Sequence, residues 1–307
     1  MGDEEREDGG SGNRRLCPSG DPGEARHPAA NGRLEQCALD ERREVLTVVR
    51  GKVGRSLVGR ATDLSARSLT LLNGVAVNNL SFRYRHGFLL GPFSTEIGAG
   101  VTCLVGANGA GKSTLFRLLA GLQKPSTGRV TLLGSGAVGY LPQSPDLPRG
   151  ATCTEFLTHV AWLQGVPRPL RADAVGRALE SVDLTTRADS RIRALSGGMA
   201  RRLGIAQALV HDPDVVLLDE PTVGLDPVQR IAVREILEKV AVDRAVIVST
   251  HLVEDVRGLA SRVLVLSEGE LVFDGDIPEL EGRAQASAPG ETPLERAMAT
   301  LISGGRP

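Results

Sequence analysis

From about residue 76 onward, short apolar runs bounded by Gly, Pro and Asp alternate with segments of helical periodicity. Nearly continuous apolar runs are typical of strands that are buried on both faces of a mostly parallel sheet. The alternation of such runs with helical segments predicts an α/β fold with a mostly parallel sheet as its core. The runs that predict strands are "GVTCLVG" (100–106), "VGYLPQ" (138–143), "DVVLLDE" (214–220) and "RAVIVSTH" (244–251).

The stretch between Pro142 and Leu195 has a different pattern, because its apolar residues recur at helical spacing. Its segments "TEFLTHVAWLQG" and "ADAVGRALESV" predict two amphipathic helices. We expect them to form a helical subdomain at about 145–195, inserted between the two halves of the sheet.

Two further patterns predict structure near the end of the chain. The segment "RVLVLSEGELVFDG" predicts a hairpin that turns at Glu268-Gly269 and adds an antiparallel β part to the sheet. The segment "TPLERAMATLIS" predicts a short helix with Thr292 as its N-cap and Pro293 at its first position. We therefore expect a main domain over 76–280 and a linker with a short helix over 281–307.

Composition narrows the possible classes of protein. The chain has 307 residues, of which 41% are hydrophobic, as is ordinary for a protein with a buried core. Residues 1–75 predict a poorly ordered extension; the first forty are rich in Gly, Arg, Asp, Glu and Pro, and the rest could hold a short helix or strand. A net charge of −1 creates no general attraction for nucleic acid, so we expect no such partner.

Neither a membrane span nor a signal peptide is predicted. No apolar run approaches the roughly 20 residues that cross a bilayer, and the N-terminal "MGDEEREDGG" lacks the basic and hydrophobic regions of a signal peptide. If the protein serves a membrane, we expect another chain to cross it.

A phosphate-binding loop is the strongest chemical signal in the sequence. The segment "GANGAGKS" matches G-x-x-x-x-G-K-[ST] and lies between an apolar strand and a helical run, the context that this motif requires. Backbone N–H groups of 109–112 would surround a β-phosphate, Lys112 would neutralise β/γ oxygens, and the Ser113 hydroxyl would bind Mg²⁺. The alternative is a glycine-rich turn that binds nothing.

Two adjacent carboxylates narrow the reaction class. Asp219 ends the predicted strand "VVLLD", where it could hold Mg²⁺, and Glu220 follows directly. A carboxylate in that position can orient and deprotonate the water that attacks a γ-phosphate. The alternative is an acidic pair that only ends a strand.

Further motifs carry a resemblance to a known family. "LSGGM" precedes "LLDEPTVGLDP", "STH" follows, and a glutamine comes after "YLP". Together with the phosphate loop, over about 76–280, these motifs resemble the nucleotide-binding subunit of ATP-binding cassette (ABC) transporters, which implies a P-loop NTPase fold that binds ATP and Mg²⁺. The resemblance assigns to ATP the loop residues Gly106, Ala107, Asn108, Gly109, Ala110, Gly111, Lys112, Ser113 and Thr114.

The same resemblance implies roles for residues outside the loop. Tyr84 would stack on adenine, with a solvated aromatic as the alternative. Gln143 would touch Mg²⁺ or the attacking water beside the metal ligands Ser113 and Asp219. His251 would reach the γ-phosphate, with a polar strand end as the alternative.

In this family two cassettes face each other head to tail, which implies sites shared between two copies. The loop Ser196, Gly197 and Gly198 would close on the γ-phosphate held by the partner copy. Asp226 would lie at the dimer interface and also cap the helix that begins at Pro227. Met199 stands where the signature most often has Gln, which removes a polar side chain but leaves the serine and both glycines intact.

The resemblance also implies partners and a location. "LSGGM", "AWLQG" and "DEPTVGLDP" resemble the ATPases of type 2 exporters, many of which are drug or antibiotic efflux pumps. We expect an integral membrane permease subunit as partner, a second cassette, and a position at the cytoplasmic face of the cell membrane. The surface expected to contact the permease offers Phe156, Val160, Trp162 and Leu163, although Trp162 could equally anchor the helical subdomain.

Three other functions compete with transport. A cassette ATPase could act on ribosomes or cluster assembly without a pump, although ribosome-acting members usually carry two cassettes. A chromosome-maintenance ATPase needs a long coiled coil, for which about eighty residues between Ser113 and Ser196 leave no room. A scaffold that does not hydrolyse ATP is disfavoured by Glu220 and His251.

Overall fold

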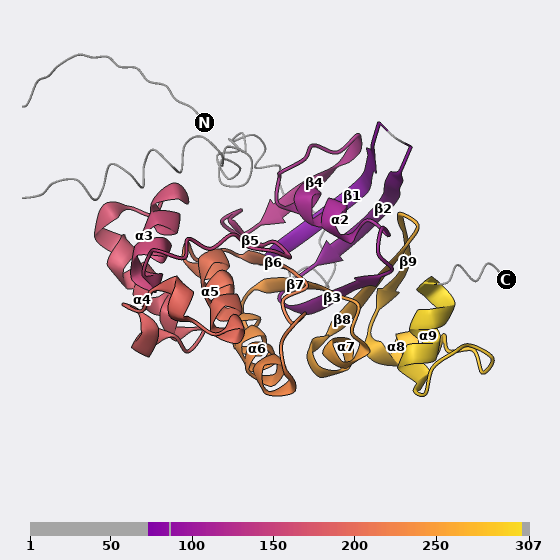
Figure 1. The fold of residues 1–307 in the computed structure, drawn as a ribbon. Helices are drawn as coiled ribbons and strands as arrows, with labels where there is room; N and C mark the ends of the chain where they lie inside the picture. The colour runs from indigo at the N-terminus through magenta and orange to yellow at the C-terminus, as the bar shows by residue number, and fades with distance from the viewer. Residues whose placement is uncertain (1–72, 86, 303–307) are drawn as a thin grey trace, which may run out of the picture. The chain divides into compact units, whose positions relative to one another are not determined.

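The computed structural model describes residues 73–85 and 87–302, and its first strand begins at Gly74. The predicted extension therefore lies outside the described residues, except for its last three positions. Figure 1 shows the described chain as two sheets with helices around them. Among the described residues, no helix has both the length and the apolar character that a membrane crossing demands.

A six-stranded sheet with the order β5-β6-β7-β3-β8-β9 forms the centre of the fold. Its first five strands are parallel, and β9 pairs antiparallel with β8. The predicted α/β class and all four predicted strands are thus confirmed. The strands are β3 (Gly100–Gly106), β5 (Val138–Leu141), β6 (Val215–Asp219), β7 (Ala245–Thr250), β8 (Arg262–Ser267) and β9 (Glu270–Gly275).

The hairpin between β8 and β9 turns where its sequence predicts. Glu268 and Gly269 have φ values of 48° and 89°, the left-handed conformation that a tight two-residue hairpin turn requires. At Gly269 a Cβ atom would also lie 2.0 Å from the carbonyl oxygen of Leu89. Glycine is therefore needed at this turn for both its conformation and its small size.

A second, antiparallel sheet has the order β2-β1-β4. Its inward-facing residues, together with α2, pack on one face of the six-stranded sheet. These strands are not predicted from the sequence, because they lack long apolar runs. They are β1 (Gly74–Arg83), β2 (Leu89–Ile97) and β4 (Thr127–Leu133).

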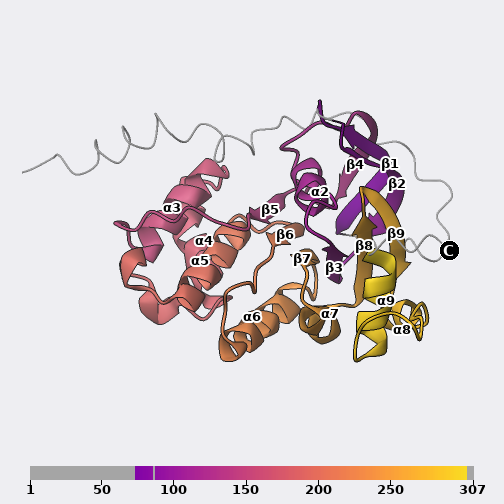
Figure 2. The same cartoon turned by 45° about the vertical axis from the view of Figure 1, so that its right-hand side comes forward.

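Helices flank the six-stranded sheet at both of its outer strands. Figure 2 shows α3 and α4 near β5, and α8 and α9 near β9. Helices α3 and α4 lie where the amphipathic segments predict them. Thr292 accepts a hydrogen bond from the Glu295 N–H over 3.2 Å and so caps α9 as predicted. The helices are α2 (Lys112–Leu119), α3 (Cys153–Leu163), α4 (Arg171–Glu180), α5 (Gly197–Leu209), α6 (Pro227–Val240), α7 (Val253–Leu259), α8 (Ile277–Glu281) and α9 (Pro293–Ile302).

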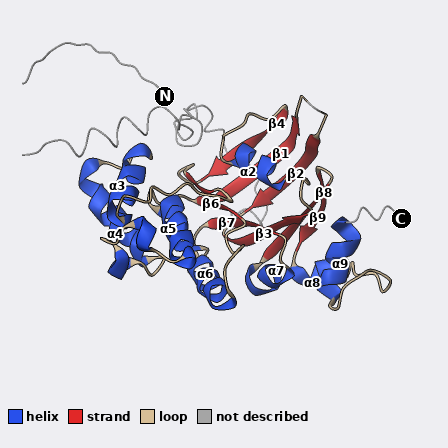
Figure 3. Cartoon of the chain, viewed as in Figure 1, coloured by secondary structure: helices blue, strands red, loops and turns tan. Residues whose placement is uncertain are grey.

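The strand period of two sends alternate residues of the central sheet to different cores. In β3, Leu104 packs toward α2 and the small sheet, whereas Cys103 and Val105 pack toward the helices on the other face. Figure 3 shows α2 on the side of the small sheet and α6 and α7 on the opposite side. Burial on both faces explains why these strands are almost entirely apolar.

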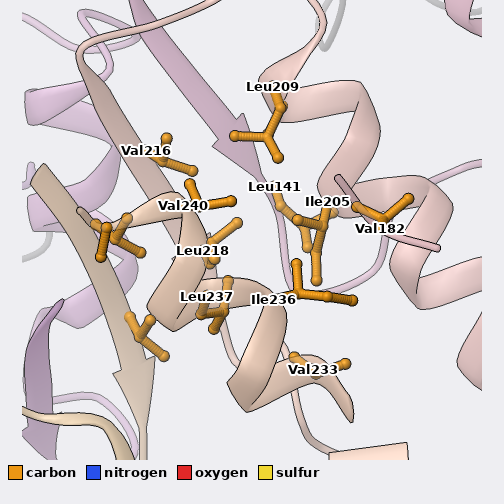
Figure 4. Packing of buried hydrophobic residues seen from close by; sticks show 14 of the residues in the cluster. Leu141, Val182, Ile205, Leu209, Val216, Leu218, Val233, Ile236, Leu237 and Val240 are labelled. Carbon is orange, nitrogen blue, oxygen red and sulfur yellow. The ribbon is translucent and has the colours of Figure 1, made fainter. Parts of the chain in front are cut away.

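Helices α5 and α6 belong to the same core on one face of the central sheet, where α5 packs against β5 and β6 and α6 contacts β3. Figure 4 shows Leu209 and Ile205 of α5 and Ile236 and Val240 of α6 converging on this part of the sheet. Each buried Leu or Ile side chain of this kind contributes about 1.5–3 kcal/mol to folding. The packing holds the start of each helix at a defined position relative to the strand ends.

Candidate functional site

The carboxyl ends of β3, β5, β6 and β7 lie at one edge of the sheet, because these strands are parallel neighbours. In open α/β sheets this edge is where ligands bind. Gly106, Asp219 and Thr250 end three of the strands, and Gln143 follows β5 after Pro142, which has no N–H to extend the ladder. The topology therefore gathers residues from four distant segments at one edge.

The loop between β3 and α2 has the backbone that phosphate binding needs. Gly109 and Gly111 have φ values of 84° and 107°. The φ of Gly111 favours glycine, and a Cβ atom there would also press on the side-chain ends of Leu90 (2.8 Å from Cδ1) and Phe88 (3.2 Å from Cζ). Helix α2 has no side-chain cap and no acidic residue in its first turn, which leaves its N–H groups free for an anion.

Lys112, the first residue of α2, lies at the base of this loop and is buried. Its ammonium donates to the carbonyl oxygens of Gly106 over 2.6 Å and Ala107 over 3.0 Å. Burial lowers the pKa of Lys112, and the nearby carboxylates of Glu220 and Asp219 oppose that change. The loop thus presents a fixed cation beside its free N–H groups.

A cavity of about 410 Å³ opens over the loop, within the usual range for small-molecule sites. Gly106 and Ala110 are buried beneath it, whereas Ala107 and Asn108 are exposed. The cavity thus brings together most of the predicted ATP residues with the acidic pair. Its lining consists of Tyr84, Phe88, Asn108, Gly109, Gly111, Lys112, Ser113, Thr114, Gln143, Asp219 and Glu220.

Two hydroxyls hold the buried carboxylate of Asp219. The Ser113 hydroxyl donates to Oδ2 over 3.0 Å, and the Ser249 hydroxyl donates to Oδ1 over 2.5 Å. Both contacts fix the orientation of the carboxylate. Hydroxyl and carboxylate oxygens are the ligands that Mg²⁺ prefers, so this pair fits the predicted metal.

Glu220 is held between the other two predicted catalytic residues. Its side chain accepts a hydrogen bond from Gln143 Nε2 over 2.8 Å at Oε2, and His251 Nδ1 lies 3.1 Å from Oε1. Glu220 is only 7% exposed, whereas the His251 side chain is 49% exposed. The structure therefore joins Gln143, Glu220 and His251 in one cluster at the cavity.

Tyr84 enters the cavity from the loop after β1. Its hydroxyl lies 3.2 Å from the Thr114 hydroxyl, and its ring meets Phe82 edge to face at a centroid distance of 4.8 Å. Phe88 lies 6.2 Å from the Tyr84 ring and also lines the cavity. The aromatic side of the site thus has two cavity-lining rings.

The predicted nucleotide residues outside the phosphate loop that do not line this cavity are Ser196, Gly197, Gly198 and Asp226; within the loop, Gly106, Ala107 and Ala110 do not line it either. Ser196 is exposed and caps α5 by accepting from the Met199 N–H over 3.3 Å. Asp226 caps α6 by accepting from the Gln229 N–H over 2.9 Å, as predicted. A Cβ atom on Gly198 would lie 2.6 Å from the side chain of Gln229, so the two helix starts pack closely.

Of the side chains that the sequence predicts to contact the permease, some are buried and one is exposed. Phe156 and Val160 are buried in the core of the α3–α5 region, because they lie on the inward face of α3. Trp162 is 54% exposed and lies 5.5 Å from the ring of His159. Trp162 therefore does not anchor the helical core.

Three residues of the site were not predicted from the sequence. Phe88 follows Tyr84 by four residues, a spacing that could have marked a second aromatic. Ser249 stands beside "TH" in a motif already singled out. Arg201 is one of two consecutive arginines after "LSGGMA", and only its tertiary contacts distinguish it from Arg202.

Comparison with known proteins gives consistent matches. The ABC transporter family matches residues 92–223. The chain is 36% identical over 219 residues to an uncharacterized ABC transporter ATP-binding protein, YxlF, of Bacillus subtilis, covering 69% of this chain and 74% of that protein. It is 34% identical to the Nod factor export ATP-binding protein I of Rhizobium sp. (strain N33), covering 70% of each chain.

The fold also matches solved structures. One is cbiO1 of Clostridium perfringens, which is part of the ABC transporter complex cbiONQ. The TM-score is 0.61 with 28% sequence identity, and the match covers 68% of this chain and 90% of that chain.

Proposed function

The chain belongs to the ATP-binding proteins of ABC transporters, and from this premise we propose that it hydrolyses ATP as one of two facing copies to power export through a separate permease. The family identifies it as an ATPase that works with membrane subunits. One observation carries the hydrolytic assignment. The buried Glu220 carboxylate is held between Gln143 and His251 at the edge of the cavity that contains the phosphate loop.

Hydrolysis at this site would be an in-line displacement at the γ-phosphorus. A water oxygen forms the new bond to phosphorus, the bond from phosphorus to the bridging oxygen breaks, and ADP leaves with that oxygen. Glu220 accepts the proton of the attacking water, and Gln143 and His251 hold the Glu220 carboxylate in place. Lys112 and the loop N–H groups stabilise charge on the phosphate oxygens.

Ser113 and Asp219 would hold Mg²⁺, with Gln143 nearby as a further oxygen ligand. Among residues 73–85 and 87–302, no group of three or more His, Cys, Asp or Glu is placed to bind a metal. One hydroxyl and one carboxylate suit Mg²⁺, which is commonly held by one or two protein oxygens together with substrate phosphates. When bound, the ion neutralises charge that develops on the β- and γ-phosphates.

The position of Ser196 supports a dimer with shared sites. Ser196 and Gly197 are exposed at the start of α5 and do not line the chain's own cavity. Free N–H groups at a helix start attract phosphate. We infer that this loop completes the site of a second copy, and that the exposed loop at Asp226 lies at the same interface.

The relatives favour export as the direction of transport. We place the protein at the cytoplasmic face of the cell membrane, bound to its permease. The similarity to a Nod factor export protein and to cbiO1, a part of a larger transporter complex, supports a separate membrane partner. Trp162, exposed on α3, is the side chain that we assign to contact with that partner. Fluorescence of this residue, the only tryptophan in the chain, reports on that contact.

A complementation experiment tests the composite ATPase. Lys112→Ala and Ser196→Ala are made in separate copies carrying different affinity tags, and heterodimers are purified. Each homodimer lacks an intact site, but the heterodimer keeps one, formed by Lys112 of one copy and Ser196 of the other. We expect it to regain hydrolysis that neither homodimer has.

The control places both substitutions in one copy and pairs it with the wild-type chain. This heterodimer contains the same changes but has no intact site, so it should be as inactive as the single variants. Equal activity of the two kinds of heterodimer, or no activity in either, would contradict the shared-site arrangement.

A further inference from the structure

Arg201 makes an internal contact that the hydrolytic scheme does not use. It lies on α5, five residues after Ser196, and is partly buried. Its Nη1 donates to the carbonyl oxygen of Gln143 over 2.9 Å, and its Nη2 donates to that of Glu220 over 2.5 Å. Burial lowers the pKa of Arg201, against the opposing effect of Asp219 and Glu220, yet a guanidinium stays charged in proteins.

The contact closes a ring of interactions around the catalytic edge. Gln143 and Glu220 are 77 residues apart and follow the neighbouring strands β5 and β6. Their side chains are hydrogen-bonded to each other, and Arg201 bonds to the backbone of both. Without Arg201, only the single side-chain bond would join these two residues, so their relative position would be less well defined.

The backbone at Glu220 makes this support important. Glu220 has a φ of 50°, a left-handed conformation that costs a non-glycine residue about 1–2 kcal/mol. Its N–H is held from β7 by the hydroxyl of Ser249 at 2.9 Å and by the Ser249 carbonyl oxygen at 3.2 Å. Its carbonyl oxygen is held by Arg201. The two sides of the strained residue are thus restrained by different elements.

We propose that Arg201 is a positioning residue, which fixes Glu220 and Gln143 for hydrolysis in its own copy. Arg201 lies on the helix that Ser196 caps. The inference rests on the proposed function and adds to it a residue that positions the proposed base.

Arg202 provides a matched control, because it is the next residue on the same helix. Its Nη1 donates to the carbonyl oxygens of Val182 at 3.1 Å and Asp183 at 3.4 Å, away from the cavity. We expect Arg201→Ala to lower turnover at least tenfold while the KM for ATP changes less than threefold, since the phosphate loop is untouched. Arg202→Ala should leave both values near those of the wild type.

Hydrogen exchange without nucleotide gives a readout that is independent of activity. In the full chain, peptides that contain Gln143 and Glu220 should exchange faster in Arg201→Ala, and unchanged exchange there would overturn the inference. If that variant does not fold, Arg201→Lys serves instead, because an ammonium lacks the two-pronged geometry of a guanidinium. Arg201→Lys should have the melting temperature of the wild type but hydrolyse ATP more slowly. Wild-type turnover in this variant would reject the positioning role of Arg201.

The complementing heterodimer separates this inference from the proposed function. Its one intact site uses Glu220 of the Ser196→Ala copy. Arg201→Ala placed in that copy should abolish most of the regained activity, whereas in the Lys112→Ala copy it should have little effect. Loss of activity from both placements, or from neither placement, overturns the inference. Failure of the parent heterodimer to regain activity contradicts the proposed function instead.

Discussion

Gln143 and Glu220, which are 77 residues apart in the chain, are joined by a hydrogen bond of 2.8 Å from Nε2 to Oε2. The bond exists because β5 and β6 are parallel neighbours whose carboxyl ends meet at one edge of the sheet. It couples the residue after β5 to the proposed base. Movement of the loop that contains Gln143 would therefore displace the Glu220 carboxylate or break its hydrogen bond to Gln143.

Glu220→Gln should abolish most ATP hydrolysis while preserving ATP binding. Glutamine has almost the same size but cannot accept the proton of the attacking water, and a lost general base typically lowers the rate about 10²–10⁴-fold. Phosphate release and nucleotide affinity are measured together. ATP-loaded dimers should also persist on size-exclusion chromatography, because the contact that hydrolysis removes remains.

Glu238→Gln is the control for that change, since Glu238 is exposed on α6. It should hydrolyse ATP at the wild-type rate. Normal turnover in Glu220→Gln would exclude this residue as the base.

Gln143→Ala should slow turnover by about ten- to a hundredfold, because a hydrogen bond to a charged group contributes about 1.5–3 kcal/mol. The phosphate loop does not depend on Gln143, so nucleotide affinity should change little. Steady-state kinetics and equilibrium binding of ATP distinguish these two effects. Gln285→Ala, at an exposed position, is the control and should match the wild type. A large loss of affinity with unchanged turnover would count against the assigned role.

Asp255→Ala should strongly destabilise the fold. Asp255 is fully buried, pairs with Arg234 at 2.7 Å, and also accepts hydrogen bonds from the hydroxyls of Thr222 and Thr250. Removing one partner of a buried ion pair costs about 3–5 kcal/mol. Urea denaturation gives the free energy of unfolding.

Asp212→Ala is the matched control, because Asp212 also pairs with an arginine at 2.7 Å but has a side chain that is 74% exposed. Such exposed pairs contribute about 0–1 kcal/mol. If both alanine variants lose similar stability, burial is not what makes the Asp255 contacts important.

Two glycines within helices should respond to alanine in opposite directions. Gly176 is exposed in α4 and a Cβ atom there would meet nothing within 4 Å, so Gly176→Ala should stabilise the protein by about 0.5–1 kcal/mol. Gly204 is buried in α5, where a Cβ atom would lie 2.9 Å from Cδ1 of Leu141, so Gly204→Ala should destabilise it by about 1–3 kcal/mol. Thermal unfolding measures both, and equal shifts would contradict this account of the packing.

Local patterns predicted the parts of the site that are contiguous in the chain. The phosphate loop is set by its own glycines and by the strand and helix on either side, so its sequence indicates both structure and chemistry. The hairpin at Glu268-Gly269 and the caps at Asp226 and Thr292 were also predictable, because each depends on residues within a few positions.

Burial around α3 was less predictable from the pattern. Phe156, Val160 and Trp162 all lie on one amphipathic helix, and each could have faced the core or a partner. The packing of α3 against α4 and α5 buries the first two and leaves Trp162 exposed. The difference arises from neighbouring helices that the local sequence does not describe.

The amino-acid order alone was sufficient to establish the α/β class, the phosphate loop and the family resemblance, because short-range periodicity and contiguous motifs carry that information. Only the folded chain reveals that Glu220 is held by Gln143, His251 and Arg201, and that Ser196 lies outside its own cavity. Those relations depend on strand order and helix packing across many residues. Such long-range contacts follow from how the whole core closes, which no single segment of sequence specifies.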